Sequence, residues 1–233
     1  MSVKGDIGKA MAYQIKREVA QRYFGYRKII EEDKQALEKM VEDFKKRFEK
    51  FIKTDLARLH LLLYEPALIE EFHSLIGWKP KQMSESSRLS RAEQDKLLMD
   101  LEPHGLTAKA RFINMVVDAY DLLYKKWEEL NDMYEEILDE AEVVNEEIKK
   151  FKNKFSLDEI LSFFRTLDKD EILSSSLGEQ VPQGHSQKLA QELAFEPVDI
   201  KALLPLFPIL PKKDEIKKQL KKLAAKAYQI KNI

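Results

Sequence analysis

The chain has 233 residues, of which seven are glycine and eight are proline, and its 40 basic and 41 acidic residues leave a net charge of −1. So few turn residues exclude a β-sandwich or β-barrel, which needs a turn about every 8–12 positions, and no run of strands alternates with the helical segments as an α/β fold requires. The lack of cysteine excludes a disulfide scaffold and any thiolate metal site.

The sequence also indicates the cellular compartment in which the protein is expected. The first 33 residues contain no apolar core of a secretory signal, and no window approaches the ~18 consecutive apolar residues of a membrane span. We therefore expect a cytoplasmic protein with no transmembrane segment. The near-neutral charge disfavours nonspecific nucleic-acid binding by the whole chain.

The first element in chain order is a long helix predicted over residues 7–63. Apolar side chains recur along it at helical spacing, and they widen into a stripe that indicates more than one neighbour. Gly25 lies inside this helix and is a candidate kink. Pro66 marks the first break, after which a short acidic helix is predicted over Ala67–Leu75.

Residues 64–105 are predicted to form a cap of short helices between two long ones. The polar stretch Ser84–Ser90 is typical of a loop. The pattern Ser90-x-x-Glu93 indicates a capping box, which opens a short helix that ends at Leu101.

The strongest periodicity predicts a second long helix over residues 107–155, with Thr107 as its N-cap. At 1.5 Å per residue this helix would be roughly 70 Å long. Its apolar residues alternate by three and four without a break, which is the seam of a left-handed coiled coil. They are Ile113, Val116, Tyr120, Leu123, Trp127, Leu130, Tyr134, Ile137, Ala141, Val144, Ile148, Phe151 and Phe155.

Residues 156–233 are predicted to supply packing helices, a proline-rich extended segment and a basic final helix. A capping box at Ser156 opens an amphipathic helix to Leu167, a short helix follows over Gln187–Phe195, and the final helix covers Lys213–Ile230. Between them, Pro205–Pro211 has proline at every third residue. This segment is either a peptide ligand for another protein or, as we favour, a strap that buries its apolar side chains against the helices.

Charge is distributed in two opposed blocks. Residues 127–148 hold ten acids and no Lys or Arg, whereas residues 212–233 hold eight lysines against two acids. A docking face for a basic partner and an arm for nucleic acid or an anionic membrane are the functional interpretations. We favour mutual neutralisation, in which the final helix packs along the acidic half of the second long helix.

Two groups of residues are candidate sites. Glu70 and His73 are three residues apart on a helix, as in one half of a helical-bundle metal site, but no second such pair accompanies them, so an ordinary histidine is the favoured interpretation. Arg22, Phe24 and Arg27 flank an aromatic cluster and are the best candidates for partner contact. No nucleophile, acid–base pair or phosphate loop predicts a catalytic residue or a cofactor.

The sequence therefore predicts an all-α, elongated single domain that is built on a long antiparallel coiled-coil hairpin. A non-enzymatic scaffold or adaptor that binds a protein partner through this hairpin or its cap is the favoured function, with homo-oligomerisation left open. The first alternative is a helical-bundle metal-binding protein or enzyme that uses Glu70 and His73. The second is an anionic membrane-surface or nucleic-acid binder that uses the lysine-rich final helix.

Overall fold

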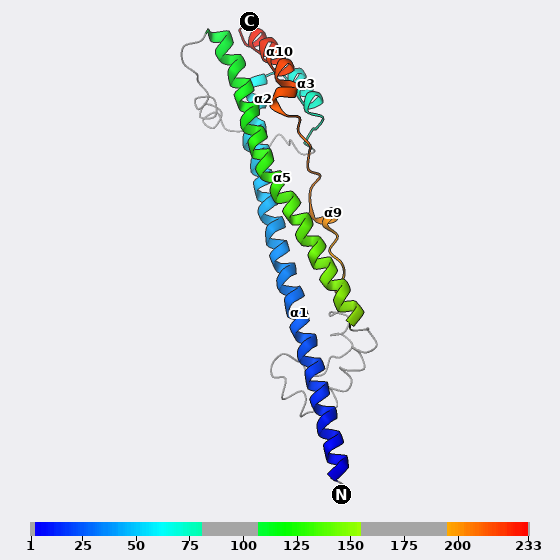
Figure 1. Cartoon of the computed structure of the whole chain (residues 1–233). Coiled ribbons are helices and arrows are strands. Elements are labelled where there is room, and N and C mark those ends of the chain that lie inside the picture. The colour runs from blue at the N-terminus through cyan, green and yellow to red at the C-terminus, as the bar shows by residue number, and fades with distance from the viewer. Residues whose placement is uncertain (1–2, 81–106, 155–194, 233) are drawn as a thin grey trace. The chain divides into compact units, whose positions relative to one another are not determined.

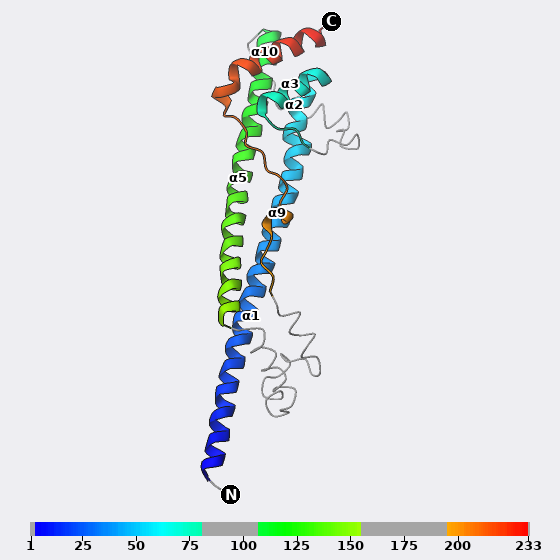
Figure 2. The same ribbon diagram turned by 90° about the vertical axis from the view of Figure 1, so that its right-hand side faces the viewer.

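The computed structural model describes residues 3–80, 107–154 and 195–232, and every regular element within them is a helix. These residues, drawn as ribbons in Figures 1 and 2, belong to two compact units. The first unit combines Met1–Met40 with Ile137–Ile200, and the second combines Val41–Glu136 with Lys201–Ile233. The predicted helices at Ser90–Leu101 and Ser156–Leu167, and most of the one at Gln187–Phe195, lie outside the described residues.

The first long helix agrees with the sequence prediction except in its interior. Helix α1 covers Val3–Phe51, a π-helical turn (η1) follows over Ile52–Leu56, and α2 continues over Ala57–Leu63. Gly25, the predicted kink, lies within uninterrupted α-helix. The irregular turn is η1, where the backbone hydrogen bonds span five residues instead of four.

The break before α3 depends on two backbone conformations. Tyr64 ends α2 with a positive φ of 65°, and Glu65 is extended, so that Pro66 begins α3 (Pro66–Ile76) at a position that needs no N–H donor. Gly77 ends α3 in the left-handed conformation, and the Trp78 N–H donates to the His73 carbonyl. Both ends lie within one residue of the predicted ones.

In the second unit, α1 packs against α5 (Ala108–Lys154), which Thr107 caps by accepting a hydrogen bond from the Ala110 N–H. The Phe44 and Tyr134 rings lie 5.6 Å apart, and the two helices run in opposite directions (Figure 2). Beside them lies an extended segment, residues 204–212, which we call the strap. It follows the short helix α9 (Ile200–Leu203).

The strap is anchored by one aromatic ring and two carbonyls. Phe207 stacks on Trp127 and Tyr134, with interplanar angles of 5° and 18°. The Trp127 indole N–H donates to the Pro208 carbonyl at 2.5 Å, and the Tyr120 hydroxyl donates to the Pro211 carbonyl. The predicted strap is therefore present.

The apolar side chains of the strap were predicted to be buried, and this prediction is wrong for two of them. Leu210 is buried, but Leu206 and Ile209 are 78% and 88% exposed. An extended chain over a helix pair directs only part of its side chains inward, and the inward positions are taken by Leu204, Phe207, Pro208 and Leu210.

Helix α10 covers Lys213–Lys231, as predicted, but its predicted position was wrong. It packs on α2 and α3 instead of the acidic half of α5 (Figures 1 and 2). It touches α5 only near that helix's start, where Tyr228 meets Phe112 and Lys213 pairs with Asp121 at 3.3 Å. Burial of Ile216, Leu220, Leu223, Ala224 and Ala227 determines this position, since apolar area outweighs the attraction between solvated charges.

The first unit has a smaller aromatic core. Phe151 of α5 lies between Tyr23 of α1 and Phe195, with ring centroids 5.4 and 5.5 Å away. The chain after Phe195 is held to α5 by Asn145, whose side chain accepts from the Val198 N–H at 2.7 Å and donates to the Val198 carbonyl at 3.1 Å. A side-chain amide thus stands in for the backbone partners that an irregular segment lacks.

Candidate functional site

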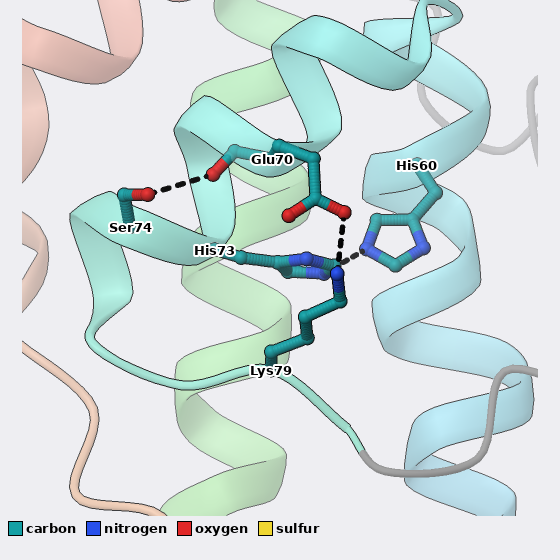
Figure 3. A network of polar contacts seen from close by, with 5 residues as sticks. All are labelled: His60, Glu70, His73, Ser74 and Lys79. Carbon is teal, nitrogen blue, oxygen red and sulfur yellow. Dashed lines mark hydrogen bonds and ion pairs between the residues drawn. The ribbon is translucent and has the colours of Figure 1, made fainter.

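The two candidate metal ligands lie on α3 in the second unit, where Figure 3 shows their surroundings. Glu70 and His73 are one helical turn apart, so they share a face, as the spacing predicts. His73 is buried, whereas Glu70 is exposed and turned toward solvent. The two side chains therefore experience different environments.

His73 contacts a second histidine, which the sequence analysis did not associate with it. His60 of α2 places its Nε2 3.0 Å from the His73 Nε2, and both side chains are buried (Figure 3). The two residues are 13 positions apart, on separate helices joined by the turn at Tyr64 and Glu65. No sequence spacing indicates such a pair, because it depends on how α3 folds back against α2.

Burial makes this pair neutral at pH 7. Desolvation, with a further contribution from the neighbouring imidazole of His73, lowers the pKa of His60 to about 4. Desolvation also lowers the pKa of His73, although the Glu70 carboxylate opposes the shift. One neutral ring donates its Nε2–H and the other accepts, while the buried His73 Nδ1 has no hydrogen-bond partner.

The arrangement provides two nitrogen donors for a metal ion but no third ligand. Lys79 binds the Glu70 carboxylate at 2.7 Å, and this hydrogen bond is the main cause of the lowered pKa of Glu70 (Figure 3). Within residues 3–80, 107–154 and 195–232, no group of three or more His, Asp or Glu side chains converges as a metal site would require. The geometry supports a buried structural contact between two imidazoles.

The predicted partner-contact residues lie on α1 in the first unit. Arg22 is exposed, whereas Phe24 is half-buried and packs its ring edge-on against Tyr23 at 5.5 Å. The Arg27 Nε donates to the Glu31 carboxylate at 2.8 Å. Of the three, Arg22 is exposed, whereas Phe24 and Arg27 are half-buried.

A pocket of about 330 Å³ lies beside the π-helical turn in the second unit, and the sequence analysis did not predict it. Both apolar and charged side chains line it, namely Phe51, Leu130 and Met133 with Arg47, Lys50, Thr54, Asp55, Lys126 and Glu129. Burial raises the pKa of Asp55, and nearby Arg58 and Lys126 oppose that shift. The π-turn brings these side chains together.

The ten acids of residues 127–148 are a candidate site of another kind. All lie on α5, and eight of them are well exposed. Glu129 pairs with Lys126, and Glu147 pairs with Lys150. Among the described residues, none of the other eight forms an ion pair, and none of the ten pairs with a lysine of α10.

Comparisons with protein-family models, with curated proteins and with solved structures found no match to this chain. None of the helices in the described part of the chain combines the length and apolar character needed to cross a bilayer. The function must therefore be inferred from the surfaces themselves.

Proposed function

We propose that the protein is a non-enzymatic helical scaffold or adaptor that binds a basic protein partner through an exposed face of α5. One observation carries the proposal: Asp139, Glu142, Val143 and Glu146 are spaced by three, one and three residues and lie together on the solvent side of α5. We call these four residues the acidic face. All belong to the first unit.

The acidic face combines unsatisfied charge with apolar area. Val143 is 53% exposed and lies outside the core, whose nearby positions on α5 are Ile137, Ala141 and Val144. The carboxylates of Asp139, Glu142 and Glu146 form no ion pair among the described residues. A partner that brought lysine or arginine around an apolar side chain would satisfy both properties.

The paired long helices support an adaptor more than an enzyme. Core residues at three- and four-residue spacing are buried along both α1 and α5, which favours a coiled-coil hairpin as the geometry of the pair. Such a pair presents side chains on an open surface, and enclosed catalytic pockets are uncommon there. We infer a cytoplasmic protein whose role is to hold a partner.

The test introduces a photo-crosslinking amino acid at position 143 of the full chain. The variant is expressed in the protein's native cell. The matched control places the same group at Lys45, an exposed residue of α1 outside the acidic face. We expect one discrete protein adduct from position 143 that is absent from position 45.

Charge reversal decides whether the acidic face itself is recognised. Glu142→Lys combined with Glu146→Lys should abolish the adduct, while Glu32→Lys combined with Glu42→Lys on α1, where each acid pairs with a lysine, should leave it intact. Identical adducts from positions 143 and 45, or an adduct that survives reversal of the acidic face, would contradict the proposal.

A further inference from the structure

The strap exposes two large aliphatic side chains that the adaptor function does not use. Leu206 and Ile209 are the most exposed large hydrophobic residues in the described part of the chain, at 78% and 88%. Isolated exposed leucines are ordinary, but two neighbouring ones on a single segment mark an interaction site.

These side chains are held outward by a fixed backbone. Pro205, Pro208 and Pro211 restrict the strap to an extended conformation, and the carbonyls of Pro208 and Pro211 accept hydrogen bonds from Trp127 and Tyr120. Leu206 and Ile209 alternate with the anchored residues Phe207 and Leu210. A binding event that covers them therefore costs little additional conformational entropy.

Cations follow directly after the strap. Lys212 ends it, and α10 continues with Lys217, Lys218, Lys221 and Lys222, all exposed and without an ion pair among the described residues. Lys213 and Lys226 are engaged by Asp121 and Glu71. None of the ten acids of residues 127–148 pairs with this basic block among the described residues, so its exposed lysines can attract other anions.

Protruding aliphatic side chains that are followed in the chain by exposed lysines fit a bilayer surface. Neither of two pockets of the second unit, one beside η1 and one between α3 and α10, is lined by Leu206 or Ile209, so neither of them provides a concavity beside these side chains. A bilayer requires none, because apolar side chains enter its interface while lysines contact acidic headgroups. Two weak signals of different kinds together give stable attachment.

We propose that the strap and α10 bind the surface of an anionic membrane, with Leu206 and Ile209 entering the interface and the α10 lysines contacting the headgroups. This surface belongs to the second unit and does not involve the acidic face. The membrane proposal and the adaptor proposal can therefore fail separately.

The experiment is co-sedimentation of the full chain with vesicles of phosphatidylcholine alone or mixed with phosphatidylglycerol. We expect binding to the mixed vesicles, and its loss at high salt. Leu206→Ser combined with Ile209→Ser should weaken binding by at least about tenfold, because two aliphatic side chains leave the interface. The matched control, Ile29→Ser on α1 combined with Leu138→Ser on α5, removes two exposed aliphatic side chains of the first unit and should bind as the wild type does.

Two further measurements separate insertion from general anion binding. Replacing Lys217, Lys218, Lys221 and Lys222 by glutamine should also weaken binding by about tenfold at low salt. In Leu206→Trp, brominated lipid should quench the fluorescence more strongly than in Leu138→Trp. No binding to the mixed vesicles, equal binding to phosphatidylcholine alone, or unchanged binding by the Leu206/Ile209 variant would overturn the proposal.

Discussion

The Phe207 ring lies parallel to the Trp127 indole, with a centroid separation of 6.0 Å, although the two residues are 80 positions apart in the sequence. Phe44 and Phe48 of α1 lie against the Phe207 ring as well, each with a centroid separation of 5.6 Å. A residue of an irregular segment thus completes a core that two helices leave open. Exposed and anchored positions of the strap should therefore respond very differently to substitution.

Phe207→Ala should destabilise the second unit by about 2–3 kcal/mol, because the ring leaves a cavity between four aromatic side chains. Leu206→Ala, one residue earlier, should change the unfolding free energy by less than about 0.5 kcal/mol since the side chain is exposed. Urea unfolding followed by tryptophan fluorescence reports on this unit, because Trp78 and Trp127 both belong to it. Equal losses in the two variants would contradict the anchoring role of Phe207.

Stability should fall as the pH is lowered from 7 to 5. Both buried histidines have a lowered pKa, so in this range the unfolded chain binds protons that the folded chain excludes. The contribution is fully present above pH 6.5 and is lost progressively toward the folded pKa of His60, about 4. With that value, His60 alone should contribute a loss of roughly 2 kcal/mol by pH 5.

The control replaces the buried pair with apolar side chains, as His60→Leu combined with His73→Leu. Its unfolding free energy should change between pH 7 and pH 5 by less than that of the wild type. If the two proteins show the same slope, the histidine pair is not the source of the pH dependence.

Two glycines should respond in opposite directions to alanine. Gly77→Ala should cost about 1 kcal/mol, because the residue has a φ of +66° that alanine adopts only with strain. Gly25→Ala should raise stability by about 0.5–1 kcal/mol, because Gly25 lies in the interior of α1 and a Cβ there meets nothing within 4 Å. Thermal unfolding followed by circular dichroism measures both, and a loss of stability in Gly25→Ala would show that helical propensity does not govern that position.

Helix α10 should depend on its apolar face and not on its charges. Leu220→Ala should destabilise the second unit by about 3 kcal/mol, as expected for a fully buried leucine. Lys226→Ala removes the exposed ion pair with Glu71 and should cost no more than about 0.5 kcal/mol. Tryptophan-detected urea unfolding at low and high salt checks both, and a large, salt-sensitive loss in Lys226→Ala would mean that charge determines the position of the helix.

The helices were predicted well because the sequence features that determine them act over short distances along the chain. The unbroken spacing from Ile113 to Phe151, the hydroxyl of Thr107 and the proline at position 66 each act within one turn, and the corresponding helix ends agree to within a residue. The bounds of the final helix, predicted over Lys213–Ile230, also agree to within a residue with α10.

What the sequence did not predict depends on distant contacts. The position of α10 was inferred from charge, yet apolar contacts with α2 and α3 determine it. Composition could not show which strap residues face inward, since Leu206 and Leu210 are chemically identical and only their place over Trp127 and Tyr134 distinguishes them. The contact between His60 and His73 required the turn at Tyr64, whose positive φ has no sequence signature.

The π-helical turn at Ile52–Leu56 has a consequence for helical phase. Buried residues of α1 recur every seven positions at Ile30, Leu37, Phe44 and Phe51, a series whose next member would be Arg58. Arg58 is buried too, but the wider turn adds Leu56, five residues after Phe51, to the core, and Leu59 and Leu63 follow at spacings of three and four. The π-turn thereby changes which residues of the following helix face inward. Removing a single residue from this turn would rotate the side chains of α2 about the helix axis by about 100°.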